Sequence, residues 1–265
     1  VPAPILGYER GQLEWVDLRA KDGTVLHASL LKPASFDPAR RYPAIVSVYS
    51  GPHAQSVRND WGHVSAFEHL LASRGFLVFS LDNRGTSNRG HAFESPLFRD
   101  LGRVELEDQL AGVAYLKSLS FVDPGRLGIW GWSYGGYMTL YALTKAPGVF
   151  RAGVAGAPVT DWTLYDSIYT ERYMGTPSSN PKGYETSSPL RAAAALQGEL
   201  LVLHGTADDN VHVANTLAFV SALVRADKPH ALNLHPRQLH GFKDKADRVA
   251  RDRAVLRHFE THLTP

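Results

Sequence analysis

The feature that most constrains the fold of this chain is residues 131–136, GWSYGG, which match the pattern G-x-S-x-G around Ser133. Residues 126–130 before it have the pattern of a short buried strand, and residues 137–143 after it that of a helix. Glycines at this spacing let a strand and a helix cross closely and let the serine adopt a strained backbone conformation. The pattern therefore predicts a nucleophilic serine on a tight strand-to-helix turn. The alternative is a glycine-rich turn that holds a serine by chance.

Apolar strands alternate with helical segments along the chain, after a hairpin signal at Asp22-Gly23. The predicted strands are residues 14–19, 25–32, 44–49, 76–81, 126–130, 152–157, 200–204 and 231–235, and the predicted helices are 61–74, 103–119, 137–143, 211–226 and 244–262. This alternation indicates a mostly parallel twisted sheet with helices on both faces. Together with the serine turn it predicts an α/β-hydrolase fold. We expect one catalytic domain over residues 1–265, in which residues 158–198 form an aromatic-rich insertion.

Composition excludes several classes of protein. The net charge of +2 is too small to argue for a nucleic-acid partner. The twelve histidines are scattered, there is no H-E-x-x-H, and the chain has no cysteine for a thiolate zinc site, so we expect no metal and no cofactor. No apolar run reaches the length of about 18 residues that a membrane span needs. The sequence leaves the compartment open between periplasmic or secreted and cytoplasmic.

The order of catalytic residues in this fold is serine, then an acid, then histidine. Asp208 follows the strand at 200–204 and His240 follows the strand at 231–235, so both belong to the sheet edge that carries Ser133. His240 is preferred over His235, which lies within a strand. Asp208 is preferred over Asp209, which has an alternative interpretation as an acid at the N-terminus of the helix at 211–226.

An oxyanion hole needs two hydrogen-bond donors. The first is the backbone N–H of Tyr134, the residue after the nucleophile. The second comes from the loop after the strand at 44–49, where the phenol of Tyr49 stands at the strand end. On position alone, Tyr49 is equally well interpreted as a half-buried aromatic residue with no catalytic role.

Taken together, these residues resemble the hydrolase domain of the prolyl oligopeptidase family, most closely its dipeptidyl peptidase IV branch. The resemblance runs from about residue 12 to the end of the chain. The matching stretches are residues 48–52 (VYSGP), 82–85 (DNRG), 105–109 (ELEDQ), 131–137 (GWSYGGY), 157–159 (APV), 166–175 (DSIYTERYMG) and 204–212 (HGTADDNVH).

The resemblance implies a triad of Ser133, Asp208 and His240, with Tyr49 as the side-chain oxyanion donor. It further implies a hydrophobic substrate pocket built from Tyr134, Val159, Trp162, Tyr165, Tyr169 and Val211. Asn210 would donate to the carbonyl of the residue before a bound proline. Proline is compact and has no N–H to satisfy, so an aromatic box suits it. Arg84 and Arg172 are interpreted as ion-pair struts around the site.

The resemblance also implies partners. Members of the family carry an N-terminal β-propeller whose paired glutamates hold the substrate amine, and we expect that propeller to be absent from these residues and to belong to a longer protein. The expected substrates are peptides with proline or alanine second from the N-terminus. A homodimer through the helices near 211–226 and 244–262 is a further expectation. Two alternatives remain: an acylaminoacyl peptidase or carboxylesterase on the same fold, and a non-catalytic interaction domain.

Overall fold

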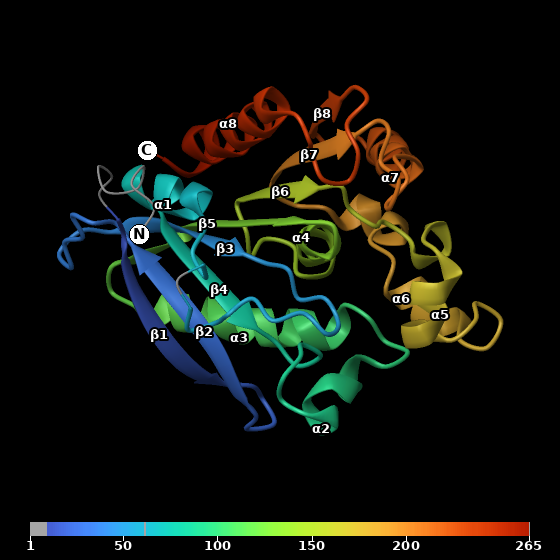
Figure 1. The fold of residues 1–265 in the computed structure, drawn as a ribbon, viewed down its shortest axis with the longest axis horizontal. Coiled ribbons are helices and arrows are strands. Elements are labelled where there is room, and N and C mark those ends of the chain that lie inside the picture. Colours follow the sequence, from blue (N-terminus) through green and yellow to red (C-terminus); the bar gives the residue numbers. More distant parts are fainter. Residues whose placement is uncertain (1–9, 61, 265) are drawn as a thin grey trace.

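The computed structural model describes residues 10–60 and 62–264, and in it one eight-stranded sheet runs through the molecule (Figure 1). Its spatial order is β1-β2-β4-β3-β5-β6-β7-β8. The strands are β1 (Gln12–Arg19), β2 (Val25–Lys32), β3 (Tyr42–Ser47), β4 (Leu77–Asp82), β5 (Val122–Trp132), β6 (Ala152–Gly156), β7 (Glu199–Gly205) and β8 (Ala231–His235). The helices are α1 (Ala66–Ser73), α2 (His91–Glu94), α3 (Arg103–Ser118), α4 (Tyr134–Lys145), α5 (Ser167–Met174), α6 (Pro181–Thr186), α7 (Ala214–Arg225) and α8 (Lys245–Leu263).

The sheet is mostly parallel, which confirms the predicted α/β-hydrolase fold. β1 and β2 form the antiparallel hairpin expected at Asp22-Gly23, where Gly23 has φ +88° and the Asp22 carboxylate accepts the N–H of Thr24 at 2.9 Å. β2 runs antiparallel to β4, and every pairing from β4 to β8 is parallel. The carboxyl ends of the parallel strands therefore meet at one edge, where active groups of such sheets gather.

Helices cover both faces of the sheet, and each face has its own apolar core. α3, α4 and α7 pack against one face, with Tyr137, Leu140 and Phe219 fully buried there. α1 and α8 cover the other face, where Leu71 and Phe259 are fully buried among strand residues. A parallel sheet buried on both sides explains why its strands are almost continuously apolar.

Three predicted element boundaries are wrong in informative ways. β3 ends at Ser47 rather than residue 49, since Val48 makes one last bond to Trp130 and Ser50 then turns the chain at φ +67°. α1 begins at residue 66, not 61, because Ser65 and Glu68 form a capping box. α7 begins at residue 214 rather than 211, and its first turn contains no acid.

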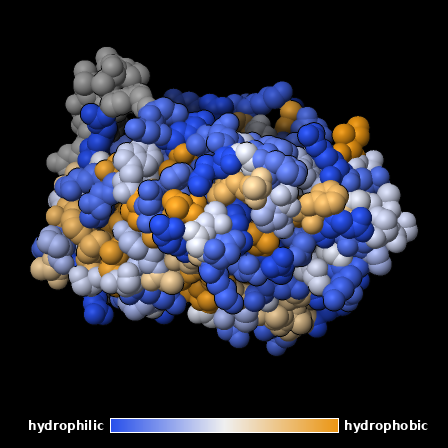
Figure 2. Space-filling model, turned by 90° about the horizontal axis from the view of Figure 1, so that it is seen from below, coloured by the Kyte–Doolittle hydropathy of each residue, from blue (hydrophilic) through white to orange (hydrophobic). Residues whose placement is uncertain are grey.

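The predicted insertion, residues 158–198, carries α5 and α6 and lies beyond the carboxyl ends of the central strands (Figure 1). It thus stands over the edge where Ser133 is placed. The molecular face seen from below carries apolar patches separated by polar residues rather than one continuous apolar surface (Figure 2). None of the helices in the described part of the chain is long and apolar enough to cross a membrane.

Candidate active site

Ser133 occupies the tight turn between β5 and α4, with φ 61° and ψ −117°. Its N–H donates to the carbonyl of Gly156 on the neighbouring strand at 2.8 Å. A Cβ on Gly131 or Gly135 would lie only 2.2 or 2.1 Å from the Val48 carbonyl oxygen. Both glycines are therefore required by the close approach of the β3 end to the turn, and the turn holds the serine in a conformation that non-glycine residues rarely adopt.

Asp208 and His240 form a hydrogen-bonded pair at the same edge of the sheet. Asp208 Oδ2 lies 2.8 Å from His240 Nδ1, while Oδ1 accepts the backbone N–H groups of Asn210 and Val211, both at 2.9 Å. Burial by itself raises the pKa of Asp208, but hydrogen bonds from His204 and His240 outweigh it and hold this pKa well below its ordinary value. The pair therefore has the carboxylate ionised, and His240 retains Nε2 for proton exchange.

His204 is a part of the site whose role was not predicted. It is fully buried, and its Nε2 lies 3.2 Å from Asp208 Oδ2 and 2.8 Å from the carbonyl oxygen of Val211. Because a carbonyl can only accept, Nε2 carries a proton and donates to both oxygens. Nδ1 lies 2.7 Å from the Thr216 hydroxyl. His204 therefore orients the carboxylate, and its place at the start of the 204–212 motif was the available signal.

Trp132 connects the histidine loop to the serine turn. The indole Nε1 donates to the backbone carbonyl of His240 at 3.0 Å, and the two rings lie 6.4 Å apart. Since Trp132 directly precedes Ser133, this bond fastens the loop after β8 to the end of β5. The structure thus brings Ser133, Asp208 and His240 to one edge of the sheet.

The two alternatives weighed against these residues lie elsewhere. His235 Nδ1 is 2.9 Å from Asp247 of α8, so it is engaged with a different carboxylate. Asp209 is exposed and precedes the first residue of α7 by five positions, so it does not belong to the first turn of that helix. The interpretation of Asp209 as a helix N-terminal acid is therefore wrong.

Tyr49 and Tyr134 lie next to each other beside the serine turn, with ring centroids 6.3 Å apart. Tyr49 is 41% exposed, whereas Tyr134 is buried. Burial, and to a lesser extent Tyr173, raise the pKa of Tyr49, and burial raises that of Tyr134 well above its ordinary value. Both phenols therefore stay protonated, and the Tyr49 hydroxyl is available as a neutral hydrogen-bond donor.

The predicted pocket residues form a connected aromatic cluster on the insertion side of the turn. Trp162 is stacked on Tyr169 at 6.1 Å and lies 5.5 Å from Tyr134, and Tyr165 meets Tyr169 edge-on at 5.4 Å. Val159 and Val211 are buried members of the same core. The Tyr165 hydroxyl donates to Asn210 Oδ1 at 2.5 Å. This bond ties the cluster to the loop that carries Asp208.

The two arginines differ from each other. Arg84 makes a bidentate ion pair with Asp108, including an Nη2–Oδ1 distance of 2.7 Å, and reaches Asp22 at 2.7 Å, which confirms its interpretation as a strut. Arg172 instead lies over the ring of Tyr173 at 5.7 Å. Within residues 10–60 and 62–264 no carboxylate is within ion-pair distance of it, so the ion-pair interpretation of Arg172 is wrong.

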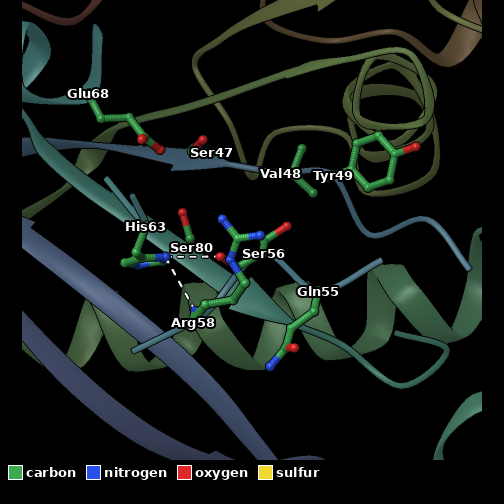
Figure 3. A pocket seen from close by; sticks show the side chains of 9 residues that line it. All are labelled: Ser47, Val48, Tyr49, Gln55, Ser56, Arg58, His63, Glu68 and Ser80. Atoms are coloured by element: carbon green, nitrogen blue, oxygen red, sulfur yellow. Dashed lines mark hydrogen bonds between the residues drawn. The ribbon is translucent and has the colours of Figure 1, made fainter. Parts of the chain in front are cut away.

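A polar hollow of about 250 Å³ opens on the other side of the Tyr49 backbone. Figure 3 shows its lining side chains, from which the ring of Tyr49 points away. His63 is fixed there by the Ser56 carbonyl at 2.9 Å and the Ser29 hydroxyl at 2.8 Å. None of the predicted pocket residues lines this hollow, so it is separate from the aromatic cluster. In the described ranges, no group of three or more histidines and acids is arranged to hold a metal ion.

The sheet order and the serine turn at the end of β5 define an α/β-hydrolase. The sequence pattern of the prolyl oligopeptidase family matches residues 63–265, and the chain belongs to that family. It is 43% identical over 226 residues to dipeptidyl peptidase 8 of Homo sapiens, which covers 83% of this chain and 25% of the relative. The chain thus spans about a quarter of the length of that protein.

Two solved structures are similar over nearly the whole chain. A candidate dipeptidyl aminopeptidase IV from Bacteroides ovatus gives a TM-score of 0.96 at 44% identity, covering 98% of this chain and 37% of that one. Dipeptidyl peptidase 4 of Porphyromonas gingivalis gives a TM-score of 0.89 at 41% identity, covering 96% of this chain and 36% of that one.

Proposed function

We propose that this chain is the catalytic part of a serine peptidase that hydrolyses peptide bonds after proline, and that the full protein releases X-Pro dipeptides from peptide N-termini. The observation that carries this proposal is the aromatic cluster against the serine turn. Tyr134 belongs to both, because its backbone begins α4 directly after Ser133 while its ring lies 5.5 Å from Trp162. Membership of the prolyl oligopeptidase family supports the same reading.

In the proposed mechanism, Ser133 Oγ attacks the carbonyl carbon of the proline residue and transfers its proton to His240 Nε2. Asp208, held ionised by its hydrogen bonds, stabilises the resulting imidazolium through Nδ1. The oxyanion accepts hydrogen bonds from the Tyr134 N–H and the Tyr49 hydroxyl, and each such donor contributes about 10²–10³ in turnover. The C–N bond then breaks as His240 protonates the leaving amine, and water hydrolyses the acyl-enzyme by the reverse proton path.

The pocket chemistry favours proline over long side chains. Trp162 is buried and Tyr169 is half-buried, and their stacked rings offer the occupant of the pocket mainly flat apolar surface. Proline has no N–H, so it enters such a site without an unpaired donor. Asn210 is held by Tyr165 through its Oδ1, which leaves its amide nitrogen to donate to the carbonyl before the proline.

We assign recognition of the substrate amine to a part of the full protein outside these residues. The chain spans about a quarter of the length of dipeptidyl peptidase 8. Leu164 and Ile168, which flank the pocket tyrosines in sequence, are 40% and 89% exposed. Apolar side chains left in solvent next to the pocket tyrosines in sequence fit a surface that another domain covers.

The first test compares the full protein and its Ser133→Ala variant on a Gly-Pro chromogenic amide. We expect cleavage by the wild type and none by the variant, and equal rates would refute the serine assignment. A Gly-Leu amide and a p-nitrophenyl ester of a long acyl chain serve as matched substrates. Turnover of the ester with no cleavage of any proline amide would point to an esterase instead. Failure of a fluorophosphonate to label the folded protein would point to a non-catalytic domain.

We also propose that the protein forms a homodimer through α7 and α8, the two helices expected from the sequence, together with the edge strand β8. Leu217 and Val224, two turns apart on α7, are 47% and 65% exposed, and Leu232 and Leu234 of the outermost strand are about a third exposed. These residues give one edge of the molecule an apolar character. Light scattering of the wild type and a Val224→Glu variant tests this: we expect the variant alone to have the mass of a monomer, and a monomeric wild type would refute the proposal.

A further inference from the structure

The helix α3 carries a row of buried polar side chains that the proposed chemistry does not use. Glu105, Asp108 and Gln109 are 0%, 1% and 2% exposed. Burying such groups is unfavourable unless each finds partners. All three come from residues 105–109, the ELEDQ stretch, and Glu105 and Gln109 lie one turn apart on the same face of the helix. The hydrogen-bond partners of these three side chains therefore show which parts of the site α3 supports.

Glu105 holds the residue that follows the nucleophile. Its Oε1 accepts the hydroxyl of Tyr134 at 2.6 Å, and its Oε2 accepts the N–H of Gly102 at 2.9 Å. The first distance lies in the range of charge-assisted O–H···O⁻ bonds. The side chain of Tyr134 is thus anchored at its outer end by Glu105 and at its backbone by the serine turn, which fixes the direction of its N–H.

Gln109 holds the turn that follows the other oxyanion donor. Its Nε2 lies 3.1 Å from each of the Ser50 hydroxyl, the Leu81 carbonyl and Asn83 Oδ1. Ser50 directly follows Tyr49 and has the unfavourable φ of +67°. A serine in this region needs support from its surroundings. Gln109 of α3 gives this support, because it bonds the Ser50 hydroxyl and the Leu81 carbonyl of β4 together. It thereby fixes the direction in which the chain leaves Tyr49.

We propose that Glu105 and Gln109 are positioning residues for the two oxyanion donors. Glu105 positions the Tyr134 N–H through the phenol of Tyr134, and Gln109 positions the Tyr49 hydroxyl through Ser50. This inference rests on the proposed peptidase function, because it assigns the oxyanion hole to Tyr49 and Tyr134. α3 then acts as one rigid support for both halves of the hole, which come from separate strands of the sheet.

Asp108 provides the matched control on the same helix. It is as buried as its neighbours, but its bonds go to Arg84, whose backbone N–H and guanidinium it accepts at 2.7 to 3.2 Å. No hydrogen bond connects it to Tyr49, Ser50 or Tyr134 within the described chain. Asp108→Asn therefore disturbs α3 without releasing either donor.

The experiment measures kcat and KM of the full protein on a Gly-Pro amide, at equal folded fraction, for Glu105→Gln, Gln109→Met and Asp108→Asn. We expect kcat to fall about tenfold to a hundredfold in the first two variants, a part of the effect of removing a donor outright, with KM changed less than about threefold. We expect Asp108→Asn to keep kcat within about twofold. Wild-type kcat in both test variants, or an equal fall in the control, would overturn the proposal.

A second readout does not depend on turnover. With ¹⁵N-labelled tyrosine in the Ser133→Ala protein, the Tyr134 amide resonance is assigned by its loss in Tyr134→Phe. Burial raises the pKa of Glu105 to about 7, so we expect this resonance to shift with pH around neutrality and Glu105→Gln to remove that step. The ionisable groups facing Glu105 are Tyr134, Tyr137 and Tyr141 of α4, Tyr169 of α5 and Asp100 before α3.

The tyrosines stay protonated in this range because burial raises their pKa values further above ten, so they do not produce the step. A Tyr134 amide that is unchanged by Glu105→Gln at every pH would overturn the positioning role. A wild type that cleaves no Gly-Pro amide would instead refute the proposed function, while the amide shift would still decide whether Glu105 positions Tyr134.

Discussion

The backbone strain at Ser133 gives a prediction about folding stability that is independent of substrate. Ser133 has φ 61° and ψ −117°, a region that residues with a Cβ rarely occupy. We compare Ser133→Gly with Ser133→Ala, because both lack the hydroxyl and differ only in the Cβ. We expect the glycine variant to be the more stable of the two, since glycine adopts this conformation without strain.

The magnitude follows from two opposing effects. A residue held in a sparsely populated region costs about 1–3 kcal/mol, which glycine relieves. Glycine loses about 0.5–1 kcal/mol more conformational entropy on folding than alanine does. Taken at the midpoints of the two ranges, the net difference in free energy of unfolding is about 1 kcal/mol in favour of Ser133→Gly. For a domain of this size, 1 kcal/mol corresponds to a shift in Tm of about 2–4 °C.

The assay is urea unfolding of both variants, followed by circular dichroism, with equal slopes required before midpoints are compared. Ser221 is the control, because it is exposed within α7, and its variants are made in the Val224→Glu background so that the proposed dimer contact on α7 does not contribute. There the order must invert, with Ser221→Gly less stable than Ser221→Ala by about 1 kcal/mol. If Ser133→Gly is no more stable than Ser133→Ala, the serine turn is not strained and the reasoning fails.

Three further predictions concern polar side chains in and around the site. Burial raises the pKa of Glu105 to about 7 in the folded protein, so the folded state holds a proton on this carboxyl that the unfolded state has lost above pH 4.5. The protein therefore loses about 3 kcal/mol of stability as pH rises from about 4.5 to 7. Urea midpoints at pH 5 and 8 should show this loss, and Glu105→Gln should remove it. Tyr165→Phe breaks the bond to Asn210 and should raise KM for a Gly-Pro amide about fivefold with a smaller change in kcat, as steady-state kinetics will show. His204→Phe removes one of the four donors of Asp208 and the imidazole donor of the Val211 carbonyl, and it should lower the free energy of unfolding by about 2–3 kcal/mol, measured in urea. An unchanged midpoint would contradict the orienting role.

The fold was predictable from the sequence because its signals are local. The first two strands were recognised by the hairpin signal at Asp22-Gly23, the other six by short apolar runs, and the serine turn by glycines within five positions of Ser133. The capping box at Ser65 and Glu68 was also a readable signal, and it would have placed the start of α1 correctly. The start of α7 was harder to place, because Asp208 takes up the N–H groups of Asn210 and Val211 and so delays the helix.

The supporting residues were not predictable in the same way, because their partners are distant in sequence. Glu105 meets a tyrosine 29 positions away and Gln109 meets a serine 59 positions away. Glu105 lies in the first turn of α3, where an acid is expected to cap the helix, so no local pattern reveals its bond to a distant tyrosine. The sequence marked residues 105–109 as part of a family motif, but only the packing of α3 under the sheet edge shows what they contact.

In the proposed mechanism, Tyr134 takes part in both substrate recognition and catalysis. Its N–H faces the proposed oxyanion, its ring packs within 5.5 Å of Trp162 in the pocket, and its hydroxyl is bound by Glu105. A proline that fills the pocket therefore presses on the same rigid residue that donates to the oxyanion. Interactions of this kind strengthen as the transition state forms, so a poorly fitting side chain should reduce kcat as well as binding. Under the proposed function, we therefore expect selectivity for proline to depend on the oxyanion hole as well as on the walls of the pocket.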